Sequence, residues 1–192
     1  PVVSSAASDV YKRQQEYSNL LYIPKKSPFD IWNRDTPKGL KLYIQRVFIM
    51  DDASHFLPLY LRFVKGVVDS NDLPLNVSRE ILQDHPLVHS IKTALTKRVV
   101  DSLRKLKKDD ISQYSEFWNE FGLVLKEGPA EEPSSKDDIA ELFIFSSTVN
   151  ENNQINRSFD DYIESCQSDD KKIYYCIGAV SYTHLRAHET CH

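Results

Sequence analysis

A polar run at residues 69–83 carries the side chains of this chain that are best suited to phosphate chemistry. It delivers Arg79 at the start of an expected helix, where Ser78 can accept hydrogen bonds from the first-turn N–H groups. The planar Arg79 guanidinium matches the oxygens of a phosphate, and Gln83, four residues on, shares its helix face. An arginine held in this way can contact a phosphate; a solvated or salt-bridged helix-start residue, which is what most arginines are, is the alternative.

Other catalytic and metal-binding patterns are weak. The chain has five glycines and no phosphate-cradling loop of the Walker type, so it is not expected to bind a nucleotide by itself. No serine-hydrolase motif or suggestive Cys–His pair occurs, and the expectation is that no metal binds. The histidines are interpreted as surface or helix-cap residues and the paired aspartates as caps or solvated turns; they are His55, His85, His89, Asp51–Asp52, Asp109–Asp110 and Asp160–Asp161.

A second candidate site is the segment that contains Phe29, Ile31 and Trp32. A loop that exposes large apolar side chains offers an adhesive surface for an unfolded polypeptide. Packing of the same side chains against a sheet is the alternative, because aromatic residues of this size are usually buried. The segment is therefore a candidate for binding an unfolded polypeptide.

Composition restricts the class of protein. A hydrophobic content of 41% and a charged content of 27% are ordinary for a globular domain, and the net charge of −4 argues against an RNA-binding module. No apolar run approaches the ~20 residues that span a bilayer, and no signal peptide is visible. Cys166 and Cys176 form no short-spaced pair, which indicates neither a disulfide framework nor a zinc site. A cytoplasmic protein with no nucleic-acid or membrane partner is expected.

Periodicity predicts an α/β chain. Strands are expected at residues 19–23 and 40–50, a helix at 55–64, and a short buried strand at 67–68 after a turn at Gly66. A long helix is expected at 86–108, and Asp110 should cap the next helix, which carries a row of inward aromatic residues and ends at Gly122.

The C-terminal third is predicted to be a separate, incomplete unit. Residues 128–136 are rich in Pro, Ser and Glu and indicate a linker. Helices are expected to begin near Ser135 and Ser158, because each has an aspartate three residues later, and residues 173–177 are expected to form a strand.

Several long words of sequence resemble one family. They are RVFIMDD at 46–52, FVKGVVDS at 63–70 and DSNDLPLNVSREILQ at 69–83, followed by FGLVLKEGPAE at 121–131 and KIYY at 172–175. Together they resemble the middle domain of the heat-shock protein 90 chaperones, in the bacterial HtpG-type branch, over about residues 15–178. Residues 1–14 and 179–192 resemble translated adapter sequence and are expected to be non-native or disordered tails.

The resemblance implies a fold and a domain plan. The fold is α/β, with a layered helix-sheet middle domain of the ribosomal-S5-like type, a helical connector and the start of a second small α/β unit. The corresponding ranges are residues 15–127 for the larger subdomain with its connector, 128–136 for the linker and 137–178 for the truncated smaller subdomain.

The resemblance also implies an activity. In this family the arginine matching Arg79 reaches the γ-phosphate of ATP held by the preceding domain, and the glutamine matching Gln83 supports that contact. Asn76 and Ser78 would shape the loop that aims the arginine. ATP with Mg would be bound by that absent N-terminal ATPase domain, so the full-length protein would be an ATPase and the fragment alone would not.

The implied partners are other domains and other chains. They comprise the N-terminal ATPase domain, an absent C-terminal domain that forms a homodimer, and unfolded client proteins bound in part near Trp32. A protein-interaction module or scaffold without a catalytic role is the alternative.

Overall fold

The computed structural model describes residues 2–6, 17–33, 39–51, 53–75, 85–146 and 155–165. The chain divides into two compact units, Pro1–Ser158 and Phe159–His192. The second unit is described only at helix α6 (Phe159–Ser165). The sheet, the core and the candidate site belong to the first unit.

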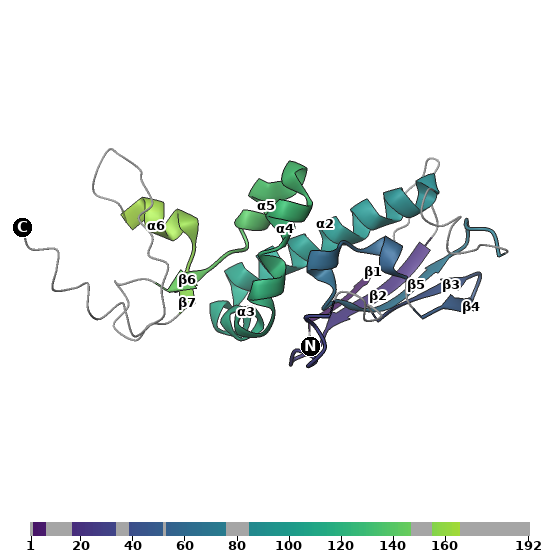
Figure 1. Cartoon of the computed structure of the whole chain (residues 1–192), viewed down its shortest axis with the longest axis horizontal. Helices are drawn as coiled ribbons and strands as arrows, with labels where there is room; N and C mark the ends of the chain where they lie inside the picture. Colours follow the sequence, from purple (N-terminus) through teal and green to yellow (C-terminus); the bar gives the residue numbers. More distant parts are fainter. Residues whose placement is uncertain are drawn as a thin grey trace, which may run out of the picture. The chain divides into compact units, whose positions relative to one another are not determined.

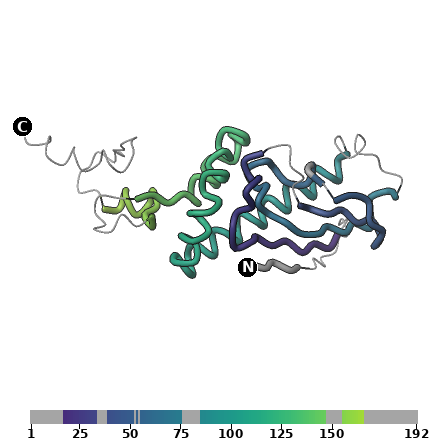
Figure 2. The backbone as a smooth tube through the Cα atoms, turned by 60° about the horizontal axis from the view of Figure 1, so that its bottom comes forward, coloured from purple at the N-terminus to yellow at the C-terminus, as the bar shows by residue number. Residues whose placement is uncertain are grey.

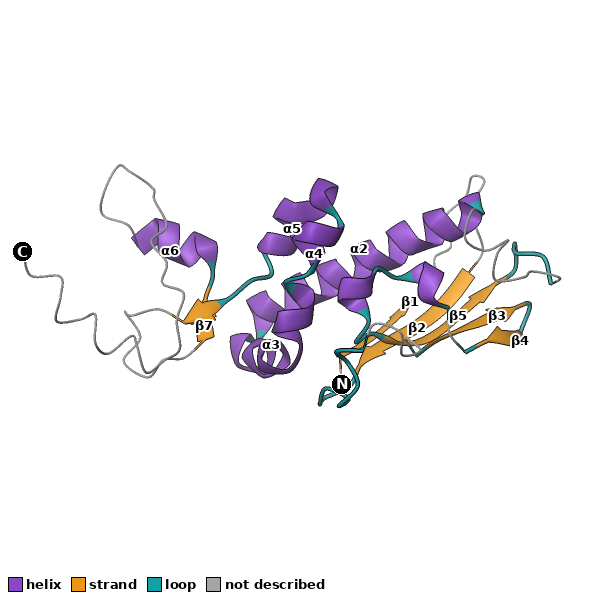
Figure 3. Cartoon of the chain, in the orientation of Figure 1, coloured by secondary structure: helices purple, strands orange, loops and turns teal. Residues whose placement is uncertain are grey.

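The first unit combines a five-stranded sheet with helices (Figures 1 and 3). Its strands are β1 (Val2–Ala6), β2 (Tyr17–Ile23), β3 (Leu40–Ile44), β4 (Val47–Met50), β5 (Lys65–Ser70), β6 (Phe145–Ser146) and β7 (Ile155–Arg157). Its helices are the 3-10 turns η1 (Ser54–Phe56), η2 (Leu59–Leu61) and η3 (Pro133–Ser135), and α2 (Pro86–Asp109), α3 (Ile111–Leu125), α4 (Gly128–Glu131) and α5 (Lys136–Ala140). The expected α/β class is confirmed.

The large sheet has the strand order β1-β2-β5-β3-β4. Strands β3 and β5 are parallel, and the other neighbours are antiparallel. Alternate residues of β3, namely Leu40, Leu42 and Ile44, are buried, so one face of the sheet forms the core. The expected strands at 19–23 and 40–50 are present, the second as a hairpin that turns at Gln45 and Arg46.

The tail predicted at residues 1–14 contributes the strand β1. Val2 is opposite Ile23 and Ala6 is opposite Asn19, so β1 covers the outer edge of β2 (Figure 1). The backbone of β2 is the purple strand along one side of the sheet in Figure 2. A covered edge no longer offers its backbone N–H and C=O groups to another chain. That residues 1–14 are a non-native tail stays a prediction.

The two long helices begin and end close to their predicted positions. Pro86 is the first residue of α2, and the His85 ring accepts a hydrogen bond from Leu87 N at 3.2 Å, which confirms that His85 is a helix cap. The side chain of Asp110 accepts from Gln113 N at 2.9 Å and caps α3 as expected.

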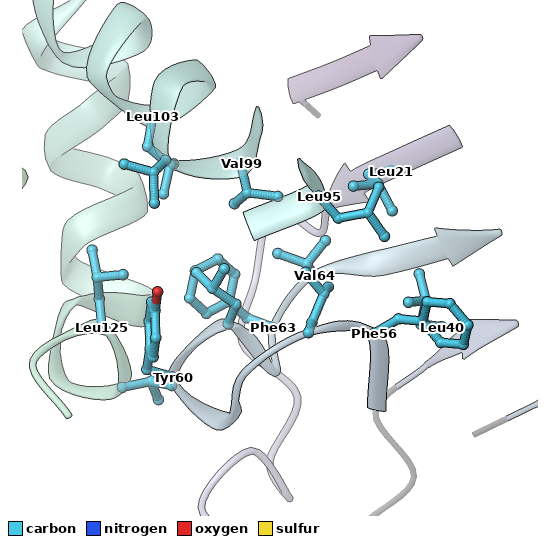
Figure 4. Close-up of a cluster of buried hydrophobic side chains, with 14 of the residues drawn as sticks. Leu21, Leu40, Phe56, Tyr60, Phe63, Val64, Leu95, Val99, Leu103 and Leu125 are labelled. Atoms are coloured by element: carbon cyan, nitrogen blue, oxygen red, sulfur yellow. The ribbon is translucent and has the colours of Figure 1, made fainter. Parts of the chain in front are cut away.

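The core lies between the sheet and these helices. Figure 4 shows side chains from the strands, the 3-10 turns and both long helices meeting in one cluster, among them Leu40, Phe56, Phe63, Leu95 and Leu125. The aromatic row predicted in α3 is buried and belongs to this core; it comprises Tyr114, Phe117, Trp118 and Phe121. Ring contacts extend this row: the ring centroids of Phe63 and Phe121 lie 5.0 Å apart, and those of Trp118 and Phe143 lie 5.5 Å apart.

The prediction of a helix at residues 55–64 is wrong. The segment forms two separate 3-10 turns, η1 and η2. Pro58 explains the break, because its ring disfavours helical backbone at the preceding residue, and Leu57 is extended with φ −141° and ψ 147°.

Two glycines were misassigned. Gly66 lies inside β5, where an added Cβ would meet the Leu20 carbonyl oxygen at 2.0 Å, so the close approach of β2 requires a glycine. Gly122 does not end α3, which continues to Leu125. It makes room for the Trp118 ring, whose nearest atom would lie 2.7 Å from an added Cβ.

The expected linker at 128–136 contains α4 and η3, and α5 follows directly. Arg104 of α2 bonds Asp138 at 3.2 Å and Glu141 at 2.9 Å, which ties this region to the long helix. Helices begin after Ser135 and Ser158 as predicted, although Ser135 makes no side-chain cap hydrogen bond. The boundary between compact units falls after Ser158, and the predicted domain plan stays a prediction.

The strand predicted at 173–177 lies outside the described residues, as do Cys166, Cys176 and the tail at 179–192.

Candidate functional site

The polar run that contains the phosphate-binding candidates is described only at its beginning. Arg79, Gln83, Asn76 and Ser78 all lie outside the described residues, so their predicted arrangement stays a prediction. The described part ends at Leu75, with Leu73 buried in the core, and resumes at the His85 cap.

The described candidate site is the loop at residues 27–33, which follows β2 and which we call the aromatic loop. Two successive turns shape it: Ile31 N donates to Pro28 O at 3.2 Å, and Asn33 N donates to Asp30 O at 2.9 Å.

The three predicted client-binding side chains separate within the aromatic loop. Phe29 is 98% exposed and Trp32 is 57% exposed, whereas Ile31 is only 6% exposed and belongs to the core. The buried Ile31 side chain anchors the loop and adds nothing to its outer surface. Client contact at Phe29 and Trp32 stays a prediction.

Helix α3 holds the start of the aromatic loop. The backbone N–H of Ser27 donates to Glu120 Oε2 at 2.8 Å. A hydrogen bond to a carboxylate is stronger than one between neutral groups, so this contact fixes where the loop leaves β2.

Arg62 holds the other side of the aromatic loop. Its Nε donates to Ile31 O at 2.7 Å, and the side chain is 5% exposed. Its two terminal nitrogens bond the two oxygens of Glu127, at 3.0 and 2.8 Å, and Nη1 also donates to Leu59 O at 3.1 Å. Each of the three guanidinium nitrogens is hydrogen-bonded and Glu127 supplies the opposite charge, which offsets the cost of removing the arginine from water.

Two neighbouring carboxylates brace the turn that carries Arg62. Glu131 accepts from Leu59 N at 2.8 Å and from Tyr60 N at 3.0 Å, and thus satisfies the first N–H groups of η2. The Tyr60 hydroxyl donates to Glu132 at 3.2 Å. Burial, followed by the charges of Glu132 and Glu131, raises the pKa of Tyr60 well above its ordinary value.

The residues that hold the aromatic loop, namely Glu120, Arg62 and Glu127, were not predicted from the sequence. Arg62 lies 31 residues from Ile31 and 65 from Glu127, and Glu120 lies 93 from Ser27. One signal was available: Arg62 interrupts an apolar segment between Leu61 and Phe63, where an unpaired charge would be costly.

Within the described residues, no group of three or more His, Cys, Asp or Glu side chains is placed to hold a metal ion. No helix of that part of the chain is long and apolar enough to cross a bilayer.

The fold and the site define a helix-covered, mixed-sheet α/β domain that presents a braced aromatic loop at its surface. Comparison with known proteins specifies the family. The family model described as Hsp90 protein matches residues 10–187, and the chain belongs to the Hsp90 family. The match extends a few residues beyond the predicted range of 15–178 at both ends.

The relatives agree with this assignment. The chain is 57% identical over 169 residues to the chaperone protein HtpG of Yersinia enterocolitica and 56% identical to that of Klebsiella pneumoniae. Each alignment covers 88% of this chain and 27% of the relative, so the chain spans about a quarter of their length. The predicted resemblance to the bacterial branch is confirmed.

A solved structure supports the fold. The middle domain of a Plasmodium falciparum heat shock protein matches with a TM-score of 0.76 and 27% identity, over 97% of this chain and 74% of that one. The predicted middle-domain fold is confirmed.

Proposed function

We propose that this chain is the part of an ATP-dependent chaperone that links ATP hydrolysis in one domain to the binding of unfolded proteins. The observation that carries the proposal is the family match over residues 10–187, which includes the whole polar run at 69–83. ATP with Mg is bound by a preceding domain, and a C-terminal domain forms the homodimer. The site of action is the cytoplasm.

The proposed catalytic part is Arg79. It enters the ATP site when the two domains close and stabilises charge on the transferred γ-phosphate, with Gln83 supporting the contact and Asn76 and Ser78 shaping the loop. Arginines delivered in this way to a phosphoryl-transfer site are worth up to about 10³–10⁵ in rate.

A chimera tests the role of Arg79. Residues 15–178 replace the matching segment of a complete bacterial HtpG chaperone, and ATP turnover and ATP binding are measured with and without Arg79→Ala. The expected result is a loss of most turnover with ATP still bound. Equal turnover in both chimeras would leave the segment as a scaffold without a catalytic role.

The proposed client surface is the aromatic loop. Its support is the exposure of Phe29 (98%) and Trp32 (57%) on a loop that is bonded to Glu120 on one side and to Arg62 on the other. A loop held in shape loses little conformational freedom when it binds, so more of the apolar contact energy contributes to affinity. The partner that suits such a surface is an extended apolar segment of an unfolded chain.

The matched control for this surface is Phe48, a 54% exposed aromatic residue of β4. We expect Phe29→Ala with Trp32→Ala to weaken the affinity for an unfolded model protein by about tenfold, and Phe48→Ala to change it less than about twofold. Unchanged affinity of the double variant would remove the aromatic loop as a client surface.

A further inference from the structure

The guanidinium of Arg62 lies where three separate segments of the chain meet. It bonds Ile31 O of the aromatic loop, Leu59 O of η2 and both carboxylate oxygens of Glu127 after α3. We propose that Arg62 is a positioning residue for client binding, which holds the aromatic loop in the shape that exposes Phe29 and Trp32. This inference rests on the proposed client role of the loop.

The bond to Ile31 O decides where Phe29 and Trp32 point. Ile31 stands between them in the sequence, and its carbonyl is fixed at 2.7 Å from Arg62 Nε while its side chain is buried. With both sides of this residue held, the two aromatic neighbours remain at the surface instead of folding back onto the apolar core.

Glu127 fixes Arg62 in turn. The bidentate pair at 2.8 and 3.0 Å orients the guanidinium plane, and that orientation aims Nε at Ile31 O. Lysine could keep the charge interaction with Glu127, but a single ammonium lacks the fork that reaches Glu127 and Ile31 O together.

The two attachments of the aromatic loop depend on α3 in different ways. Glu120 of α3 accepts directly from Ser27 N, whereas Glu127, two residues after the end of α3, acts through Arg62, which bonds Ile31 O. In the sequence, Phe29 lies between Ser27 and Ile31, the two residues whose backbone is bonded.

The experiment compares Arg62→Lys with Arg104→Lys in the 192-residue chain. Arg104 is a matched control, because its guanidinium bonds the carboxylates of Asp101, Asp138 and Glu141, none of which belongs to the aromatic loop. Hydrogen exchange of the Ile31 and Asn33 amides reports the order of the loop, and the affinity for an unfolded model protein reports binding.

We expect Arg62→Lys to speed exchange of the Ile31 and Asn33 amides by about tenfold or more and to weaken client affinity by about three- to tenfold, whereas Arg104→Lys changes neither. In a chain that already carries Phe29→Ala and Trp32→Ala, Arg62→Lys should not weaken binding further. Glu127→Gln keeps the size of the side chain and removes its charge. If Arg62→Lys fails to fold, this variant should show the same two effects, faster amide exchange and weaker client affinity.

The outcomes separate the two claims. Unchanged amide exchange in Arg62→Lys, or an equal loss of affinity with and without the two aromatic side chains, overturns the positioning role of Arg62. Full affinity in the Phe29→Ala, Trp32→Ala chain overturns the client role of the loop, whatever the exchange data show for Arg62.

Discussion

The aromatic loop and the β3–β4 hairpin both expose a large aromatic side chain, but for different reasons. Phe48 is exposed because it points from β4 to the open face of the sheet, where its ring meets that of Tyr43 at 5.6 Å. Trp32 is exposed because its loop is bonded to side chains from distant parts of the sequence. Exposure in the hairpin belongs to an edge strand, where Val47 and Phe48 are both exposed, whereas exposure in the loop depends on tertiary contacts.

This difference indicates which exposed apolar residue is a candidate for function. A strand residue on an open sheet face is exposed whether or not it binds anything. The aromatic loop uses a buried arginine and two glutamates to support a surface that would otherwise be free to collapse onto the core. The comparison therefore favours Phe29 and Trp32 over Phe48 as the contact surface.

The largest effect on stability should come from removing the side chain that supports the aromatic loop, compared with one that supports the hairpin. Arg62→Met removes the buried guanidinium that pairs with the Glu127 carboxylate and should lower the free energy of unfolding by about 3 kcal/mol. Asp69→Ala removes only the bond from Arg46 N at the hairpin turn, 3.2 Å long and exposed, and should cost less than about 1 kcal/mol. Urea unfolding measures both, and equal losses would contradict the distinction between the two regions.

Alkaline pH should lower the free energy of unfolding through two buried tyrosines, Tyr60 and Tyr114. Burial raises the pKa of Tyr60, beside Arg62, and of Tyr114, in α3, above the ordinary value of 10.0. The unfolded chain loses these protons above about pH 10 while the folded chain keeps them, so stability is complete below that pH and falls above it by about 1.4 kcal/mol per pH unit for each tyrosine.

Tyr60→Phe tests this pH dependence. It should lower stability slightly at neutral pH, because the bond to Glu132 is lost, and make the decline above pH 10 shallower. Unfolding curves between neutral pH and pH 11 measure the slope, and an unaltered slope would contradict the assignment.

The smallest effect concerns the turn of the hairpin. Gln45 and Arg46 have φ of 49° and 66°, a backbone conformation that Asn and Gly adopt at lower cost. Replacing the pair with Asn-Gly should raise the free energy of unfolding by about 1 kcal/mol without changing client affinity. Changed affinity would show that the hairpin, too, contributes to binding.

The sequence predicts the elements whose signals are local. The long helix α2, the Asp110 cap and the buried Trp118 follow from spacing and residue type within a few turns of chain. The prediction of a helix around Pro58 was wrong, because it gave more weight to the helical spacing of apolar residues than to the restriction that a proline places on the residue before it.

The site is only partly visible in the sequence. Phe29 and Trp32 could be singled out as large apolar residues in a loop, but their separation from Ile31 depends on which side chain reaches the core. The bond from Arg62 to Ile31 O joins elements that only the tertiary fold brings together, so no local pattern predicts it. Arg79 was singled out by its place at an expected helix start and given a role by the resemblance, and that role stays a prediction.

The most direct test of the account is site-specific photo-crosslinking to an unfolded model protein. A benzoylphenylalanine is placed at the position of Trp32 in one chain and at the position of Phe48 in another, so that both probes are comparably exposed. We expect strong adducts from the aromatic loop and background adducts from the hairpin. Equal adducts from the two positions would contradict the claim that the braced loop is the client surface.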